Sequence, residues 1–234
     1  MLNNKDDYIY PESITENFDN ANFHIRYCLS FIKKYLQGDI LEVGAGCGSF
    51  TRNYLSDKIN SLTLTEKDNL NFVNLSKKFK GNLKVKVLKE SVSNLKNKYD
   101  VILYLHVLEH IEDDNKEIQE AVKKLNDNGI LIIMVPAHQK MYSNLDKVVG
   151  HYRRYDIDFF KKKINFIKLI NLKFLDSTGF LLYKLNNLIF KKEKFPTKLK
   201  IFIWDKFFTP LSIIIDFILM YKLGKCILAI YKKD

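Results

Sequence analysis

The sequence predicts an α/β fold in which helices cover both faces of a mostly parallel, doubly wound β-sheet. Along the 234 residues, apolar runs of strand length alternate with longer amphipathic segments, a pattern typical of such sheets. The runs at 100–105 and 130–135 are apolar without alternation, as expected of strands buried on both faces. A glycine-rich turn at 44–48 joins a strand to a helix, the kind of place where this fold class holds ligands.

The first half of the chain supplies three of the predicted strands. Segments with apolar residues at helical spacing are assigned to helices, and the short apolar runs between them to strands. Gly81 follows the third helical segment and suits a helix C-cap, because glycine tolerates the left-handed conformation. In chain order we expect a helix at 19–36, a strand at 39–43, a helix at 49–55, a strand at 61–65, a helix at 68–79 and a strand at 84–88.

The second half completes the sheet. Asn128 and Gly129 supply a turn before the fifth strand, and Asp156 is a candidate N-cap for a short helix. The last two strands enclose a long apolar and basic insertion. We expect strands at 100–105 and 130–135, a helix at 157–163, and strands at 172–177 and 226–231.

Composition is that of one globular domain over residues 1–234, with 47% apolar residues and no Pro/Gly/Ser-rich linker. We divide off an N-terminal helical cap at 1–38, a loop at 136–156 that covers the substrate, and a helical insertion at 179–224. The N-terminus is polar, which argues against a secretory signal and favours the cytoplasm. The apolar stretch at 211–221 is too short to cross a bilayer and contains Asp216.

Cysteine spacing and net charge limit the classes of function. Cys28, Cys47 and Cys226 lie far apart, without the spacing of a metal site, so we expect reduced thiols and no metal. The net charge of +11 suits nucleic acid or an anionic membrane surface. However, the charge comes mostly from scattered lysines, as is typical of a solvated surface. Basic residues also do not alternate with aromatic ones at motif spacing. Nucleic acid is not an expected partner.

The turn at 44–48 carries the sharpest local signal. Backbone amides at a helix N-terminus attract a negatively charged ligand group, and glycines allow close approach and unusual backbone angles. A tight turn without a ligand is the alternative. A dinucleotide fingerprint would need glycine where Ser49 stands. The pattern is therefore GxGxG, preceded by an acidic residue at Glu42.

In these residues the chain resembles the class I S-adenosylmethionine (SAM)-dependent methyltransferases, whose first motif is an acidic residue followed by GxGxG. The resemblance implies a Rossmann-like, seven-stranded sheet with an antiparallel last strand, and SAM as cofactor with S-adenosylhomocysteine (SAH) as product. It places the methionine part of SAM at the turn, and the ribose hydroxyls on an acid ending the second strand. The implied cofactor residues here are Glu42, Gly44, Ala45, Gly46, Gly48, Glu66 and its neighbour Lys67.

Two of these assignments have alternatives. A carboxylate offers two acceptor oxygens to a vicinal diol, yet Glu66 also fits an exposed acid that leads into a helix. After the third strand the family usually has an Asp for the adenine amino group, with an apolar neighbour against the ring. Here those positions hold Ser91 and Val92, a departure that weakens the assignment of Ser91 as the adenine contact.

Histidines follow the fourth strand in the segment 104–114. His106 and His110 are spaced i,i+4, but Val107 occupies the place of the glutamate that a zinc HExxH motif needs. The segment is similar to the "HVLEHI" motif of the small-molecule branch of these methyltransferases. The resemblance implies that His106 lines the SAM pocket and that Glu109 and His110 shape the floor near the methyl group. Packing is the alternative for Glu109.

The segment at 135–155 is too long to be a simple connection, and long loops over a ligand edge usually serve function. It resembles a subgroup assigned to sugar, glycan or natural-product pathways that reads "VPA…LY…D…GHxRRY". This implies a cover over the substrate, with His151 as the first candidate for general base because imidazole titrates near neutrality. The alternative is a structural network in which Asp146 pairs with an arginine. The catalytic candidates are His151, His110 and Tyr155, and the substrate-binding candidates are Tyr142, Asp146, Arg153 and Arg154.

The insertion at 179–224 mixes aromatic and aliphatic residues with lysine clusters at 191–194 and 198–200. Such a segment suits a membrane surface or a lipid-linked substrate. The alternatives are a helix that covers the sheet, or a dimer face, so the chain is expected to be a monomer or a homodimer. Trp204 and Phe207 are expected in the core.

These patterns favour methyl transfer from SAM to an oxygen or nitrogen of a small molecule, such as a sugar, a glycan precursor or a natural-product intermediate. A methyltransferase acting on RNA or protein is the main alternative, suggested by the charge. A SAM-binding scaffold or partner subunit without transferase activity is the alternative from another class, and a nicotinamide enzyme is a more distant one.

Overall fold

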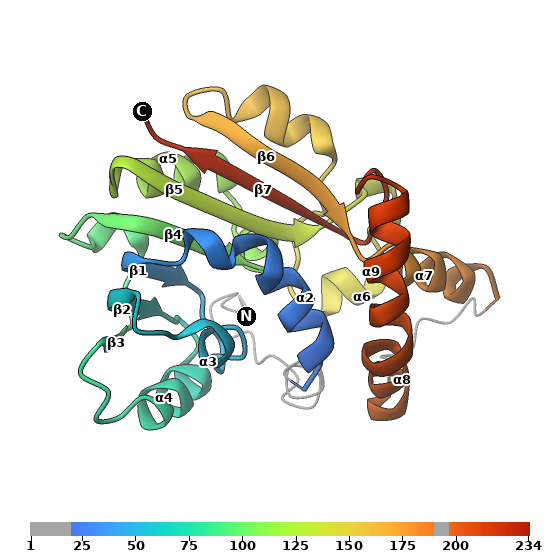
Figure 1. Ribbon diagram of the computed structural model, residues 1–234, viewed down its shortest axis with the longest axis horizontal. Helices are drawn as coiled ribbons and strands as arrows, with labels where there is room; N and C mark the ends of the chain where they lie inside the picture. Colours follow the sequence, from blue (N-terminus) through green and yellow to red (C-terminus); the bar gives the residue numbers. More distant parts are fainter. Residues whose placement is uncertain (1–19, 190–196) are drawn as a thin grey trace, which may run out of the picture.

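The computed structural model describes residues 20–189 and 197–234. The chain forms a seven-stranded sheet in the order β3-β2-β1-β4-β5-β7-β6, flanked by helices (Figure 1). The pairs from β3 to β5 are parallel, and β7 runs antiparallel to both β5 and β6. The predicted doubly wound α/β sheet with an antiparallel last strand is confirmed.

The strands follow the predicted order with shifted ends. β5 starts earlier than predicted, because Leu125 already pairs with Tyr99 before an irregularity that contains Asn128 at φ 61°. β6 also starts earlier, because this edge strand pairs only with β7 and includes polar residues. The strands are β1 Gly38–Val43, β2 Ile59–Thr65, β3 Val85–Leu88, β4 Tyr99–Leu105, β5 Leu125–Pro136, β6 Lys168–Leu175 and β7 Cys226–Lys232.

Side-chain caps set several helix ends. Asp68 accepts a hydrogen bond from the Asn71 backbone N at the start of α4, and Gly81 has φ +83° after its end. The helical run at 157–163 begins directly after Asp156, as predicted, but the Asp156 carboxylate accepts from the Gln139 backbone N rather than from the helix. The helical elements are α2 Asn22–Ile32, η1 Lys33–Tyr35, α3 Thr51–Tyr54, α4 Asn69–Lys78, η2 Val92–Asn94, η3 Leu108–His110, α5 Asp114–Lys123, η4 Gln139–Met141, α6 Asn144–Val148, η5 Phe159–Lys163, α7 Ser177–Ile189, α8 Lys198–Ile203, η6 Trp204–Phe208 and α9 Thr209–Ile218.

Two apolar clusters bury the two faces of the sheet. Ile40 packs into the cluster beneath α2 and α4, whereas the next residue, Leu41, packs into the cluster that includes α5. Both side chains are fully buried, as expected when successive strand residues point to opposite faces. Both faces of the sheet are therefore covered by packed side chains. A ligand can bind only at the edge where the carboxyl ends of the strands lie.

The insertion before β7 stands at one end of the sheet. Helices α7, α8 and α9 lie together there, beside α2 (Figure 1). Trp204 is partly buried and donates to Asp176 Oδ2 at 3.2 Å, but Phe207 is 66% exposed, so its predicted place in the core is wrong. The lysines at 191–194 and the first half of the predicted N-terminal cap lie outside the described residues. Within 20–189 and 197–234, no helix is both long enough and apolar enough to span a bilayer.

Candidate functional site

The glycine turn leaves the carboxyl end of β1, between β2 and β4 in the sheet. Gly44, Gly46 and Gly48 have φ angles of +62°, +56° and +75°, a backbone region that residues other than glycine rarely adopt. A Cβ on Gly46 would meet no protein atom within 4 Å. The Ala45 backbone N donates to Thr65 O at 2.9 Å and fixes the turn against β2. The glycines are thus required by the backbone, and Gly46 borders open space.

Glu66 lies directly after β2 and faces this turn. Its Oε2 accepts from the Gly46 backbone N at 2.8 Å, and its Oε1 accepts from the Asp68 backbone N at 2.8 Å. Only 9% of the residue is exposed, so the alternative of an exposed, helix-leading acid is wrong. Burial raises the pKa of this carboxyl, and the backbone hydrogen bonds oppose that rise. Lys67 is exposed beside it.

Glu42 acts on the turn from inside the protein. Its Oε2 accepts hydrogen bonds from Thr51 Oγ1 at 2.5 Å and from the Tyr54 hydroxyl at 2.6 Å. Burial raises the pKa of Glu42 to about 7, against the effect of the two hydroxyl donors. The carboxyl therefore ties β1 to α3 and so positions the turn between them. Its contact with the cofactor itself stays a prediction.

The residues predicted to meet adenine lie after β3. Ser91 is partly buried and its Oγ lies 3.0 Å from Ser93 Oγ. Val92 is 1% exposed and packs in the core with Leu95. Ser91 is the residue before η2, three positions after the end of β3. Both assignments stay predictions.

Four titratable side chains lie together where β4 ends. Glu109 is buried, and its Oε1 lies 3.7 Å from His106 Nδ1 and 4.0 Å from His151 Nε2. Burial alone would raise the pKa of Glu109, but His106, His151 and His110 lower it below its usual value. The His110 ring meets the His151 ring edge-on at 4.6 Å, and burial lowers the pKa of His110 to about 4. Val107 would touch a Cβ on Gly44, so the group adjoins the glycine turn.

Asp146 organises the 136–156 segment. Its Oδ1 lies 2.8 Å from both His151 Nδ1 and Arg154 Nε, and its Oδ2 accepts from the Ser143 backbone N at 2.9 Å. Tyr142 donates its hydroxyl to His151 O at 2.6 Å. The alternative that Asp146 pairs with an arginine to brace the segment is what the structure shows. That same pairing orients His151.

The remaining predicted residues of this segment face partners within the protein. Arg153 Nη1 lies 2.6 Å from Asp114 Oδ2, and the buried Arg154 guanidinium lies 4.6 Å from the Tyr183 ring. The Tyr155 hydroxyl donates to Asp114 Oδ2 at 2.9 Å and is buried. These contacts give Arg153, Arg154 and Tyr155 a bracing role. Asp114 itself was missed from the sequence, because its partners follow about 40 residues later in the chain.

The buried Asp146 predicts a loss of stability in acid. Burial opposes ionisation, but His151 and Arg154 lower the pKa of Asp146 to about 2, below the usual 3.8. An acid with a depressed folded-state pKa stabilises the fold above its unfolded pKa, and this contribution disappears as pH falls from about 4 through 2. We expect Asp146→Asn to lower the free energy of unfolding by roughly 2 kcal/mol at pH 6, with the difference vanishing near pH 2. Urea titrations of both proteins across this range measure it, with the exposed-site variant Asp57→Asn as control; a constant difference would contradict it.

Comparisons with known proteins show the family of the chain. A family model described as a methyltransferase domain matches residues 16–173. A ubiquinone biosynthesis O-methyltransferase of Rickettsia bellii (strain OSU 85-389) is 27% identical over 134 residues, 55% of this chain and 56% of that protein. The corresponding protein of Rickettsia typhi is 28% identical over 138 residues, 56% of each. The chain thus spans about half the length of the curated relatives it matches.

Solved structures agree on the fold. A chain from the complex of the Haloferax volcanii Trm112 methyltransferase activator with a methyltransferase has a TM-score of 0.68 at 10% identity, covering 99% of both chains. The N-methyltransferase NodS from Bradyrhizobium japonicum WM9, solved with SAH, has a TM-score of 0.59 at 13% identity, covering 97% of this chain and 94% of that one. Because the family model matches more than half of the sequence, the chain belongs to the methyltransferase-domain family.

Proposed function

We propose that this enzyme transfers the SAM methyl group to an oxygen or nitrogen of a small molecule, such as a sugar, a glycan precursor or a natural-product intermediate. One observation carries the proposal. The imidazole of His151 is held by Asp146 beside the buried Glu109, in the group that adjoins the glycine turn. The SAM sulfonium is already a good leaving group, so the enzyme mainly has to orient the acceptor and remove its proton.

The hydrogen bond to Asp146 sets the tautomer of the neutral His151 imidazole. An ionised carboxylate only accepts hydrogen bonds, so His151 Nδ1 carries the proton and donates it to Asp146 Oδ1. The other nitrogen, Nε2, then has a lone pair available to act as a base. Glu109 is also an acceptor and lies 4.0 Å away, so it does not occupy that lone pair. Glu109 Oε2 is buried without a hydrogen-bond partner among the described residues.

Two experiments test the assignment. Calorimetry should show binding of both SAM and SAH to the purified chain; no heat with either, on folded protein, would remove the basis of the proposal. A methyl-transfer screen with labelled SAM should then incorporate label from a metabolite and glycan extract. Label that appears only in added RNA or protein would instead favour a macromolecular acceptor.

We also propose that the protein works in the cytoplasm at an anionic membrane surface, reached through α8, η6 and α9. These elements follow one another without a break over residues 198–218. Unlike a helix on the surface of a globular protein, this segment turns polar residues toward the protein and apolar residues outward. The side facing the protein carries polar residues, among them the fully buried Thr209, Ser212 and Asp216. The outer side is apolar, with its most exposed members at Leu199, Phe202, Phe207, Ile214, Phe217 and Ile218.

Charge selects an anionic bilayer as the occupant of this apolar face. Both acids of the segment are buried, and Asp216 accepts hydrogen bonds from Tyr27 and from two backbone amides. The exposed charges beside the face are therefore lysines, at positions 198, 200 and 222. A helix with an apolar face flanked by lysines lies in a membrane interface, where anionic lipids add electrostatic attraction. Two copies of the chain would place like charges against each other.

Vesicle sedimentation tests this surface. We expect the chain to pellet with vesicles of phosphatidylglycerol and phosphatidylcholine and far less with phosphatidylcholine alone. The double variant Phe207→Ser/Phe217→Ser should weaken binding at least about tenfold, because two buried phenyl groups are lost. Leu83→Ser removes an even more exposed apolar residue elsewhere and should bind as the wild type does. If the wild type does not bind vesicles but forms dimers, and the double variant is monomeric, this face instead joins two copies of the chain.

A further inference from the structure

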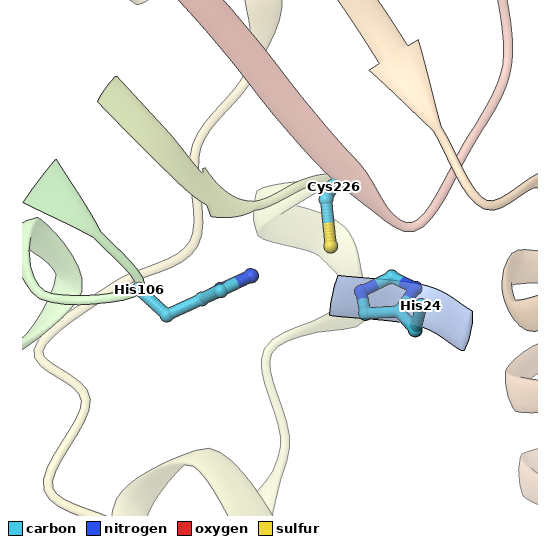
Figure 2. Close-up of side chains that lie close together, drawn as sticks. All are labelled: His24, His106 and Cys226. Atoms are coloured by element: carbon cyan, nitrogen blue, oxygen red, sulfur yellow. The ribbon is translucent and has the colours of Figure 1, made fainter. Parts of the chain in front are cut away.

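The fold brings together two histidines and a cysteine that lie far apart in the sequence. His106 follows β4, Cys226 opens β7, and His24 lies on α2 (Figure 2). One ligand atom from each lies within 4.8 Å of the others. Figure 2 shows the His106 ring and the Cys226 sulfur both directed toward the space beside the His24 ring. Three separate elements thus present nitrogen and sulfur donors to one point.

We propose that His24, His106 and Cys226 bind a divalent transition-metal ion of the zinc class. Thiolate and imidazole are the ligands that Zn²⁺ prefers, and three protein ligands with one open position are typical of its catalytic sites. Donor atoms in a tetrahedral zinc site lie about 3.3–3.6 Å apart, given the usual bond lengths. The ligand atoms here need to close by at most about 1.5 Å, within the reach of side-chain rotation.

The buried histidine supports a ligand at this point. His24 is 8% exposed, and its Nδ1 is buried with no hydrogen-bond partner in the described part of the chain. Its other nitrogen, Nε2, lies 3.5 Å from Cys28 Sγ. A buried polar atom without a partner costs about 1–3 kcal/mol, and a metal ion would satisfy it.

A carboxylate behind one ligand completes the pattern. Glu109 Oε1 lies 3.7 Å from His106 Nδ1, which leaves His106 Nε2 for the metal. Metal-binding histidines usually donate their second N–H to a carboxylate or carbonyl in this way. His106 also has φ +61°, which aims its ring across the end of the sheet. The group Glu109, His110 and His151 also converges, but it lacks a sulfur donor and serves the acid–base chemistry described above.

The open position gives the site a use in methyl transfer. Cys226 and His24 are buried, whereas 32% of the His106 side chain is exposed, so the fourth position opens on the His106 side. There an acceptor oxygen could bind beside the glycine turn. This use rests on the proposed function; metal binding itself does not.

Cobalt substitution tests the site on the full-length, metal-free protein. We expect one Co²⁺ per chain, displaced by Zn²⁺, with the near-ultraviolet absorption of a cobalt–thiolate bond. Cys226→Ser should abolish this absorption, and Cys47→Ser should keep it, because Cys47 lies in the glycine turn. His24→Gln should keep the thiolate absorption but weaken Co²⁺ binding at least about tenfold.

SAH binding and circular dichroism are measured on each variant to confirm that it is folded. Wild-type protein that binds SAH but gives no cobalt–thiolate absorption would overturn the metal site and leave the proposed function intact. Absorption that survives in Cys226→Ser would also overturn it. Cobalt binding through Cys226 in a protein that ignores SAM and SAH would support the metal site while the proposed function failed.

Discussion

Gly46→Val is expected to lower the affinity for SAM at least about 100-fold, or about 2.7 kcal/mol, in a protein that still folds. A Cβ at Gly46 would enter open space rather than touch the protein, so the valine methyls would occupy room that the ligand needs. The other glycines of the turn are poorer choices. A Cβ on Gly44 would lie 2.8 Å from Val107 Cγ1, and one on Gly48 would lie 2.9 Å from Leu75 Cδ1, so both variants would also disturb packing.

Gly81 provides a matched control for the backbone. It too has a positive φ, +83°, and open space around its missing Cβ, but it lies in the turn after α4. Valine at either position pays about 1–2 kcal/mol for the left-handed conformation. The two variants should therefore melt at similar temperatures, while Gly81→Val keeps its SAM affinity within about twofold. Equal losses of SAM affinity in both would mean that backbone strain, and not a blocked ligand space, was measured.

The fold and the cofactor edge were predictable because their signals are local. The apolar runs of β4 and β5 can be recognised without knowing which strands they pair with. Three glycines in one turn likewise predict the positive φ angles found there. The place of Glu66 beside the glycine turn was predictable for the same reason, because the end of a strand fixes which edge of the sheet the next residue meets. Its burial was not predictable, since that depends on the Gly46 amide that it contacts.

The sequence pattern could not predict which polar residues pair across the fold. The run at 151–155 left open whether the arginines bind a substrate or pair with an acid of the protein, and in the structure Arg153 meets Asp114 and Arg154 meets Asp146. Likewise, the spacing of the cysteines in the sequence predicted no metal site. That spacing does not indicate that β7 inserts between β5 and β6. That insertion brings Cys226 beside His106. Contacts between distant residues depend on topology, which periodicity alone does not specify.

His151→Ala should slow methyl transfer about 100-fold or more while SAM affinity stays within about twofold. Loss of a general base removes this much rate, and Asp146 shows that the imidazole is oriented for the task at 2.8 Å. The ring meets His110 and approaches Glu109, but it makes no contact with the glycine turn in the described structure. Single-turnover rates with saturating SAM, together with calorimetry for SAM, separate the two effects.

His138→Ala is the matched control, because His138 lies on the same segment but stacks on Phe174 at 5.2 Å, toward β6. Its transfer rate should remain near that of the wild type. Unchanged turnover in His151→Ala would remove His151 from the catalytic role and leave the neighbouring Glu109 to accept the proton.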